Sequence, residues 1–195
     1  MSNFDAGAYL RNEHAEHLTV ANALLAKVAE PFDKMVRVIT DSLSKGGKVL
    51  FFGNGGSAGD AQHLAAELVV KYSKDRKPLG GVALTTDTSV LTATVNDFGP
   101  QFVFVRQVQA IGRKGDVAFG ISTSGNSENV ILALQAAKEI GITPVGLAGG
   151  TGGKMVGLAD PLLVVPSTNS ARIQEMHIFL GQCMCGAVER AMGLV

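Results

Sequence analysis

Two residues that can exchange protons or bind a metal lie one helical turn apart in the first half of this chain. His63 and Glu67 fall within Val49–Leu68, where an apolar stretch runs into a Gly/Ser turn that opens a helix. Side chains four residues apart project from the same face of a helix, so the imidazole and the carboxylate are expected side by side. The turn before them, GNGGS at 53–57, offers bare backbone N–H groups at a helix N-terminus, which favours an anion. The segment predicts chemistry on a phosphorylated small molecule.

A second turn of the same type occurs near the middle of the chain. Residues 122–127, STSGNS, follow an apolar run that ends at Gly120. Four hydroxyl groups and a glycine at the start of a helix can hold a phosphate through side-chain and backbone donors together. Such runs are also common as ordinary turns and helix caps, so this loop alone is a weak signal. Its combination with the turn at 53–57 favours phosphate binding.

From Gly47 onward, short apolar runs alternate with segments of helical periodicity. Each run is continuous, as strands buried on both faces of a sheet should be; the runs are Val49–Phe52, Gly81–Leu84, Val117–Gly120, Pro144–Leu147 and Leu162–Val165. Helices are expected over residues 57–73, about 87–112, 127–140, 152–158 and about 170–192. This rhythm predicts an α/β fold with an open, doubly wound, five-stranded parallel sheet, in one domain over residues 1–195. Ligands of such sheets bind beyond the carboxyl ends of the strands, where both turns lie.

The segment before the first strand has helical periodicity on both sides of Pro31. We expect two helices there, forming a helical hairpin over residues 1–46 that precedes the sheet and the C-terminal helix at 47–195. Such a hairpin can pack on the sheet or on another subunit. The apolar composition favours a subunit contact.

Composition narrows the classes of function. The chain has 195 residues, 46% of them hydrophobic and only 17% charged, which is apolar enough to suggest surface buried between subunits. Its formal net charge is zero, so no nucleic-acid partner is expected, and neither a secretory signal nor a membrane span is predicted. Cys183 and Cys185 fit neither a disulfide framework nor a zinc site and are expected to be buried, reduced thiols. These features indicate a cytoplasmic protein.

A dinucleotide site is an alternative for the first turn. Gly53, Gly55 and Ala58 satisfy the spacing G-x-G-x-x-A. That site also needs an acidic residue about 20 positions further on, and the nearest candidate at the end of a second strand, Asp87, lies too far along the chain. The hydroxyl loop at 122–127 has no required role in that fold. A nicotinamide or flavin site is therefore the weaker interpretation.

Four segments together resemble the sugar isomerase (SIS) family and, within it, the phosphoheptose isomerases: NGGSAGDAQHLAAEL at 54–68, ALTTDTSVLTATVNDFG at 83–99, GISTSGNSENV at 120–130 and ARIQEMH at 171–177. The resemblance covers nearly the whole chain. It implies a flavodoxin-like SIS domain in a homotetramer whose active sites are shared between subunits, with one zinc ion per subunit. It also implies the conversion of sedoheptulose 7-phosphate, a phosphorylated seven-carbon sugar, to D-glycero-D-manno-heptose 7-phosphate. That product feeds ADP-heptose for lipopolysaccharide.

The resemblance assigns His63 to the metal, and Glu67 and Gln174 to both metal and substrate. It implies substrate contacts from loop and helix residues, namely Asn54, Gly55, Gly56, Asn96, Asp97, Ser122, Thr123, Ser124 and Ser127. Ser57, which closes the first anion-binding turn, is counted with them. Aldose–ketose exchange moves a proton between adjacent carbons through an enediol, so it needs a base and a donor to the oxygens that change charge.

Glu67 is the best candidate for the base, since an apolar neighbouring face could raise its pKa towards a useful value. A solvated helix carboxylate is the structural alternative for Glu67. For His63 the alternative is a histidine that only satisfies local hydrogen bonds, and its pairing with Glu67 argues against that.

One position departs from the family pattern. The family has a histidine eight residues after the glutamine of RIQ, as fourth zinc ligand and second acid/base group, and this chain has Gln182 there. Gln182 therefore occupies a predicted catalytic and metal position without its chemistry, because an amide does not titrate near neutral pH and is a poor zinc ligand. His177 cannot replace it, because it points away from the face of Gln174 and Gln182, and we expect a structural role.

Three accounts of Gln182 stay open: an introduced substitution that silences the enzyme, a natural variant that still turns over through Glu67, or a protein that binds sugar phosphate without catalysis. The rival function is a non-catalytic SIS regulator that binds the bacterial replication initiator. The retained His63 and Glu67 weigh against it. A sugar-phosphate sensor of transcription regulators is weaker, because no helix-turn-helix segment accompanies the domain.

Overall fold

In the computed structural model, which describes residues 4–195, the centre of the fold is a five-stranded sheet with all strands parallel. Its order is β2-β1-β3-β4-β5, with β1 Val49–Gly53, β2 Gly81–Ala83, β3 Val117–Ser122, β4 Thr143–Gly149 and β5 Leu162–Val165. All five predicted strands are confirmed, and every residue of β1 and β3 is buried. The order reverses between β1 and β3, the point at which open sheets of this kind bind ligands.

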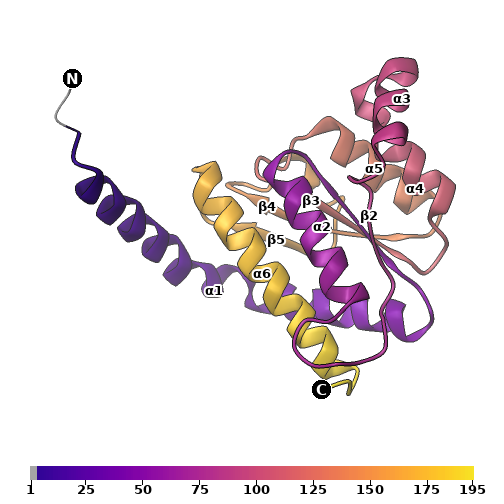
Figure 1. The fold of residues 1–195 in the computed structure, drawn as a ribbon, viewed down its shortest axis with the longest axis horizontal. Coiled ribbons are helices and arrows are strands. Elements are labelled where there is room, and N and C mark those ends of the chain that lie inside the picture. The colour runs from indigo at the N-terminus through magenta and orange to yellow at the C-terminus, as the bar shows by residue number, and fades with distance from the viewer. Residues whose placement is uncertain (1–3) are drawn as a thin grey trace.

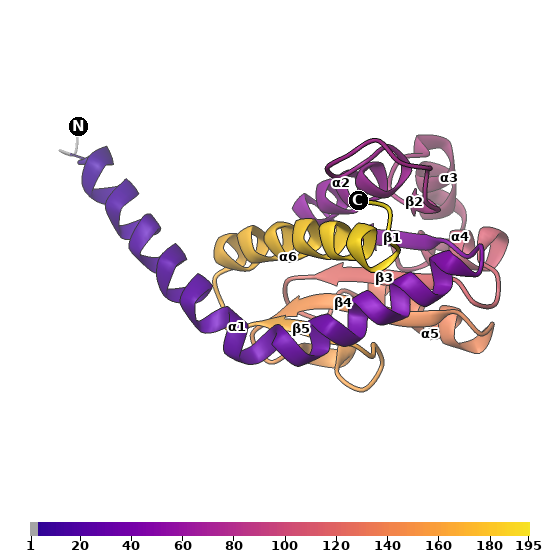
Figure 2. The same ribbon diagram turned by 90° about the horizontal axis from the view of Figure 1, so that it is seen from below.

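Helices cover both faces of the sheet, as the two views in Figures 1 and 2 show. One face carries α1 Ala6–Ser44, α2 Gly56–Val69 and α6 Ser170–Ala191, which share a hydrophobic core with residues such as Phe51 and Phe119. The other face carries α4 Val105–Ile111 and α5 Glu128–Glu139 over a second core around Leu50 and Phe52. Within residues 4–195, none of the helices has the length and apolar character that crossing a membrane requires. The flavodoxin-like doubly wound α/β architecture is thus confirmed.

The expected N-terminal hairpin is wrong, because residues 6–44 form one continuous helix with Pro31 inside it. The buried residues Val20, Leu24 and Val28 before the proline and Met35 and Ile39 after it keep the helical spacing, so a single apolar stripe runs along α1. Burial of that stripe outweighs the roughly 3 kcal/mol that an interior proline costs. Figure 2 shows α1 bending part-way, as helices with an interior proline do, and its first half reaching beyond the sheet. Residues 1–3 of the predicted hairpin lie outside the described residues.

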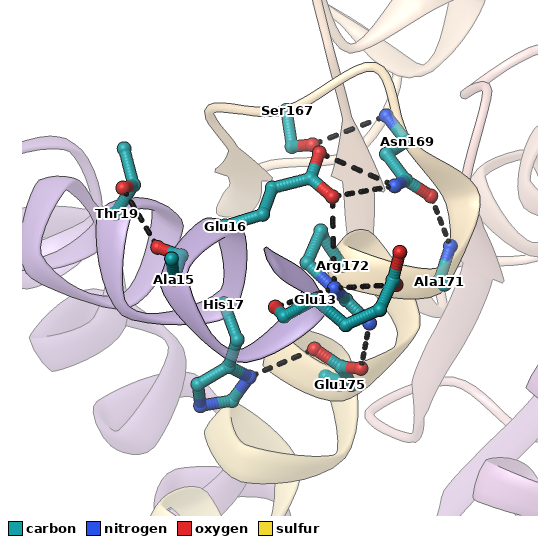
Figure 3. Close-up of polar contacts among 10 residues, drawn as sticks. All are labelled: Glu13, Ala15, Glu16, His17, Thr19, Ser167, Asn169, Ala171, Arg172 and Glu175. Carbon is teal, nitrogen blue, oxygen red and sulfur yellow. Dashed lines mark hydrogen bonds and ion pairs between the residues drawn. The ribbon is translucent and has the colours of Figure 1, made fainter. Parts of the chain in front are cut away.

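The projecting half of α1 is tied to α6 by one buried guanidinium (Figure 3). Arg172, 6% exposed, donates to Glu13 Oε2 at 2.9 Å and to Glu175 Oε1 at 2.6 Å. His17 Nδ1 lies 2.8 Å from the other oxygen of Glu175, and the Asn169 amide donates to the Glu16 carboxylate. The hydrogen bond to Glu175 is the largest cause of a raised pKa of Arg172; burial opposes it, and the charges of Glu175 and Glu13 add to it. The start of α6 is thereby held against the first half of α1.

Three predicted helices are shorter than expected, of which the one predicted over 57–73 ends at Val69 as α2. The single helix over about 87–112 is broken into α3 Thr88–Phe98, a 3-10 turn η1 Pro100–Phe102, and α4. Gly99 has a φ of +99°, which favours glycine, and Pro100 cannot continue the preceding helix. The helix expected over 152–158 is only the 3-10 turn η2 Gly153–Met155, because Gly152 and Gly153 also have positive φ.

Helices α2 and α6 run parallel, side by side on the sheet (Figure 1). Gly56 at the start of α2 faces Gln174 near the start of α6, and Leu64 faces Gly181 further along both. A Cβ on Gly181 would lie 2.6 Å from Leu64 Cδ2, so glycine is needed for this close approach. The parallel course brings Glu67, near the end of α2, level with Gln182 on α6.

Candidate active site

The first phosphate-type turn links β1 to α2 at the carboxyl edge of the sheet. Gly55, the residue before the helix, has a φ of +55°, a conformation that glycine adopts without strain. It leaves the first N–H groups of α2 without a side-chain cap, as an anion-binding helix start requires. Ser57 is buried, and a Cβ on Gly56 would lie 2.7 Å from Gln174 Nε2. The Gln174 amide is therefore in contact with this turn.

The second turn lies beside the first because β1 and β3 are neighbours. Ser122 ends β3, Ser127 precedes α5, and their hydroxyl oxygens are 2.9 Å apart. The amides of Asn54 and Asn129 exchange two hydrogen bonds of 2.9 and 2.8 Å, which join the first turn to the start of α5. The two predicted phosphate turns thus form one continuous polar edge of the sheet.

A pocket of about 290 Å³ opens at this edge, on the far side of the second turn. Its polar lining includes Thr123 and Ser124 together with four hydroxyl residues that the sequence analysis did not single out, Thr151, Ser167, Thr168 and Ser170. The signal for the last three was present, since STNS at 167–170 follows the fifth predicted strand just as STSGNS follows the third. The pocket offers hydroxyl donors, suited to an anionic or polyhydroxylated ligand.

His63, Glu67 and Gln182 form a second polar group, near the other end of α2. His63 Nε2 lies 2.9 Å from Glu67 Oε1 and 2.7 Å from Gln182 Nε2. Gln182 Nε2 is 3.4 Å from Glu67 Oε1. A ring with its proton on Nε2 donates it to the carboxylate, whereas a ring protonated on Nδ1 accepts from the amide. The Glu67 side chain is only 18% exposed, so it is not a freely solvated carboxylate.

Asp60, one turn before His63 on α2, has an unusual carboxyl group. Its Oδ2 is buried without a hydrogen-bond partner among the described residues. Burial raises the pKa of Asp60 to about 6, and the nearby charge of His63 partly opposes that rise. The helix that carries His63 and Glu67 therefore also carries a carboxyl group that titrates close to neutral pH.

His177 and the two cysteines take structural positions. His177 is fully buried and its Nε2–H donates to the Ala148 carbonyl at 3.1 Å; burial lowers its pKa to about 4, against the effect of that hydrogen bond. This agrees with the structural role predicted for it. Cys183 and Cys185 are free thiols as predicted, but only Cys185 is fully buried, and burial raises its pKa to about 12; Cys183, expected to be buried too, is partly exposed.

The donor set of one chain does not fit a closed zinc site. Among residues 4–195, no three His, Cys, Asp or Glu residues lie close enough together to hold a metal. His63 and Glu67 supply one imidazole and one carboxylate, and the third neighbour, Gln182, supplies an amide, which binds zinc poorly. Gln174 lies eight residues before Gln182, about 12 Å along the helix axis, and contacts Gly56 instead.

The predicted site residues thus fall into three groups within one chain. The first group is the carboxyl edge of the sheet, with Asn54, Gly55, Gly56, Ser57, Ser122, Thr123, Ser124, Ser127 and Gln174. His63, Glu67 and Gln182 form the second group, near the opposite end of α2. The third is Asn96 and Asp97, whose exposed side chains bond to one another at 2.7 Å near the end of α3. Among the described residues, the hydrogen bonds of His63, Glu67 and Gln182 stay within their group, as does the bond between Asn96 and Asp97, and none joins the third group to the second.

Comparisons with known proteins agree with this geometry. The sequence profile of the SIS domain matches residues 15–149. A phosphoheptose isomerase of Paramagnetospirillum magneticum is 60% identical over 91% of this chain and 91% of its own, and one of Helicobacter pylori is 47% identical over 93% and 94%. The solved structure of a phosphoheptose isomerase from Neisseria gonorrhoeae aligns with a TM-score of 0.89 at 43% identity, over 95% of this chain and all of its own.

The match to the domain profile and the identity over nearly the full length of these relatives point to the same assignment. The chain belongs to the SIS domain family and, within it, to the group of the phosphoheptose isomerases.

Proposed function

We propose that this protein interconverts sedoheptulose 7-phosphate and D-glycero-D-manno-heptose 7-phosphate, an aldose–ketose isomerisation that supplies ADP-heptose for lipopolysaccharide. The observation that carries the proposal is the partly buried Glu67 carboxylate in contact with His63, on the helix that starts in a phosphate-type turn. The relatives named phosphoheptose isomerase support it. A non-catalytic regulator would not need this carboxylate, and the comparisons give that alternative no support.

The phosphate is bound in this proposal at the carboxyl edge of the sheet. The N-termini of α2 and α5 both lie at this edge, and both helix starts lack a side-chain cap, so the positive ends of two helix dipoles face the anion. The hydroxyl groups of Ser122, Ser124 and Ser127 add side-chain donors, and Thr123 lines the adjoining pocket. An anion held by several neutral donors needs no lysine or arginine in direct contact.

Proton transfer is assigned to Glu67. As general base it removes a proton from C1 of the ketose to give an enediolate, and the protonated carboxyl returns that proton to C2. The hydroxyl proton of O1 passes to O2, which leaves the aldehyde at C1. The side chains of His63 and Gln182 lie 2.7 Å apart, and both contact the Glu67 carboxylate, at 2.9 and 3.4 Å. Their N–H groups are suited to donate to the oxygens that carry negative charge in the enediolate. Gln182 can stabilise charge in this way but cannot shuttle a proton.

The active site is proposed to be shared between subunits of a homotetramer. Gly56 and Glu67 lie near opposite ends of α2, about 16 Å apart along the helix axis. A second copy of the chain can bring its own Glu67 group to the phosphate edge of the first, together with Asn96 and Asp97. Exposed apolar side chains on the projecting part of α1, including Tyr9, Leu10 and Leu18, offer surface for such a contact.

Zinc is proposed to bind weakly in this chain, because Gln182 replaces a good ligand by a poor one. The substrate class also bears on location: sugar phosphates are charged metabolites of the cell interior, so the proposed reaction is cytoplasmic.

The test is incubation of the purified protein and of Gln182→His with sedoheptulose 7-phosphate, with the aldoheptose followed by NMR. Product from either protein is the expected result. If neither forms aldoheptose although both bind the sugar phosphate, the proposed function is wrong and a binding role remains.

A further inference from the structure

An ion pair that the proposed mechanism does not use is buried behind Glu67. Arg76, in the loop between α2 and β2, donates from Nε to Glu189 Oε1 at 2.8 Å. The side chains are 2% and 0% exposed. Removing both charges from water is costly, so such a pair depends on further hydrogen bonds to its members. Among the described residues, Glu189 Oε2 is buried without a hydrogen-bond partner, and the contacts of the pair run through Oε1 and the guanidinium. The remaining N–H groups of Arg76 show what the pair holds in place.

Arg76 binds the end of α2. Its Nη2 donates to the Glu67 carbonyl at 2.6 Å, and its Nη1 donates to the Leu68 carbonyl at 2.7 Å. The last four carbonyls of a helix have no partners within the helix, and a cation there also complements the helix dipole. The guanidinium therefore holds the peptide group of Glu67 itself, together with that of the next residue.

Glu189 fixes this guanidinium from α6. Its Oε1 accepts from the Tyr72 backbone N–H at 2.9 Å as well as from Arg76, so it also holds the chain just after α2. Glu189 lies seven residues, two helical turns, after Gln182 on α6 and thus on the same face. The helix α6 thereby contacts the Glu67 side chain through Gln182 and the Glu67 backbone through Glu189 and Arg76.

We propose that Arg76 and Glu189 are positioning residues that set where the Glu67 carboxylate lies relative to the substrate. This inference rests on the proposed role of Glu67 as the base. Displacement of a catalytic group by about 1 Å can cost roughly 100-fold in rate. A lysine at position 76 keeps the charge beside Glu189 but lacks the planar fork that reaches Glu189 and two carbonyls at once.

The test is Arg76→Lys, made in wild type or, if only Gln182→His is active, in that background. We expect kcat to fall about 10- to 100-fold, with KM within about twofold and an unchanged circular dichroism spectrum. The matched control is Lys48→Arg, at the amino-terminal edge of the sheet, where Lys48 Nζ lies 2.6 Å from the buried Asp116. This control changes a partly buried ion pair equally conservatively and should leave kcat unchanged. An unchanged kcat in folded Arg76→Lys would overturn the proposal.

Hydrogen exchange separates this inference from the proposed function. In Arg76→Lys, amides in the last turn of α2 should exchange about tenfold faster than in wild type, with no change there in Lys48→Arg. If no protein tested is active, the proposed function fails, and unaltered exchange would then also reject the positioning role. Glu189→Gln keeps an oxygen acceptor but removes the charge, and it should move kcat and exchange in the same direction. If Arg76→Lys does not fold, kcat and hydrogen exchange of Glu189→Gln test the proposal in its place, and no change in either would overturn it.

Discussion

The amide nitrogen of Gln182 lies 2.7 Å from His63 Nε2 and 3.4 Å from Glu67 Oε1. It therefore contacts both members of the pair to which the proposal assigns proton transfer. Because one ring nitrogen cannot donate to Glu67 and accept from Gln182 at the same time, the amide competes with the carboxylate for His63. The ring nitrogen of His63 that carries the proton is thus tied to the residue at position 182.

Gln182→His is expected to gain isomerase activity and bound zinc together. An imidazole at this position adds a strong zinc ligand and a group that titrates near neutral pH, whereas the amide supplies neither. Restoring a general acid/base group should raise kcat by about 100-fold or more. Zinc content by elemental analysis and kcat with sedoheptulose 7-phosphate provide the measurements.

The matched control for that substitution is Gln182→Leu, which removes the amide and adds no ligand. It should bind no more zinc than wild type and should be no more active than wild type. Equal gains of kcat in the leucine and histidine variants would contradict the role given to the new imidazole, because loss of the contact between Gln182 and His63 would then explain the gain.

Mixing two inactive variants tests the shared site. Glu67→Gln removes the base, and Ser127→Asp keeps a good residue before α5 while placing a negative charge against the phosphate. Each variant alone should be inactive. After joint refolding, about a quarter of wild-type activity is expected if each site takes Glu67 and the loop from different subunits. No recovery would show that the loop and the base of one site come from the same chain.

Stability should fall as the pH drops from 7 to 5, in part because of His177. Its folded pKa of about 4 lies below the ordinary value of 6.5, so only the unfolded state takes up a proton in this range. The loss from this group is about 2 kcal/mol between pH 7 and pH 5. His177→Gln can still donate to the Ala148 carbonyl and should show a smaller pH dependence in urea unfolding. An equal dependence in both proteins would mean that His177 is protonated in the folded state.

Asp60 should have the opposite effect. Because its folded pKa is raised to about 6, the charged carboxylate opposes folding above that pH. Asp60→Asn is expected to be more stable by about 1 kcal/mol at pH 7.5, after allowance for the partial exposure of the group. The difference should narrow as the pH falls below about 6, where the folded protein binds the proton. Urea unfolding of both proteins at pH 7.5 and at a pH below about 6 measures the difference in their free energies of unfolding. A difference that does not change with pH would contradict the raised pKa of Asp60.

The sheet could be predicted from the sequence because its strands are continuous apolar runs. Val117–Ser122 is buried along its whole length, as expected of a strand that helices cover on both faces. The error at Pro31 arose from giving local preference too much weight, since the apolar stripe from Val20 to Ile39 stays in phase across the proline. The sequence does contain a signal for the helix end at Gly99, because a Gly-Pro pair marks the end of a helix.

The chemistry of the site could be predicted more fully than its geometry. The spacing of His63 and Glu67 was sufficient to pair them, whereas Gln182 was singled out by the family resemblance, with helical phase placing it on the face of Gln174. Local periodicity does not say which end of one helix lies against which end of another. For that reason the distance between Glu67 and the phosphate turn, and the contact of Arg76 with Glu67, emerged only from the folded chain.

The matched course of α2 and α6 limits how this protein can change in evolution. Inserting one residue into either helix would turn everything beyond it by about 100° and move it by about 1.5 Å. An insertion midway along α6 would therefore uncouple Gln182 and Glu189 from their partners on and after α2 while leaving Gln174 in place. Between those contacts, the two helices can therefore tolerate replacement of residues but not a change in length.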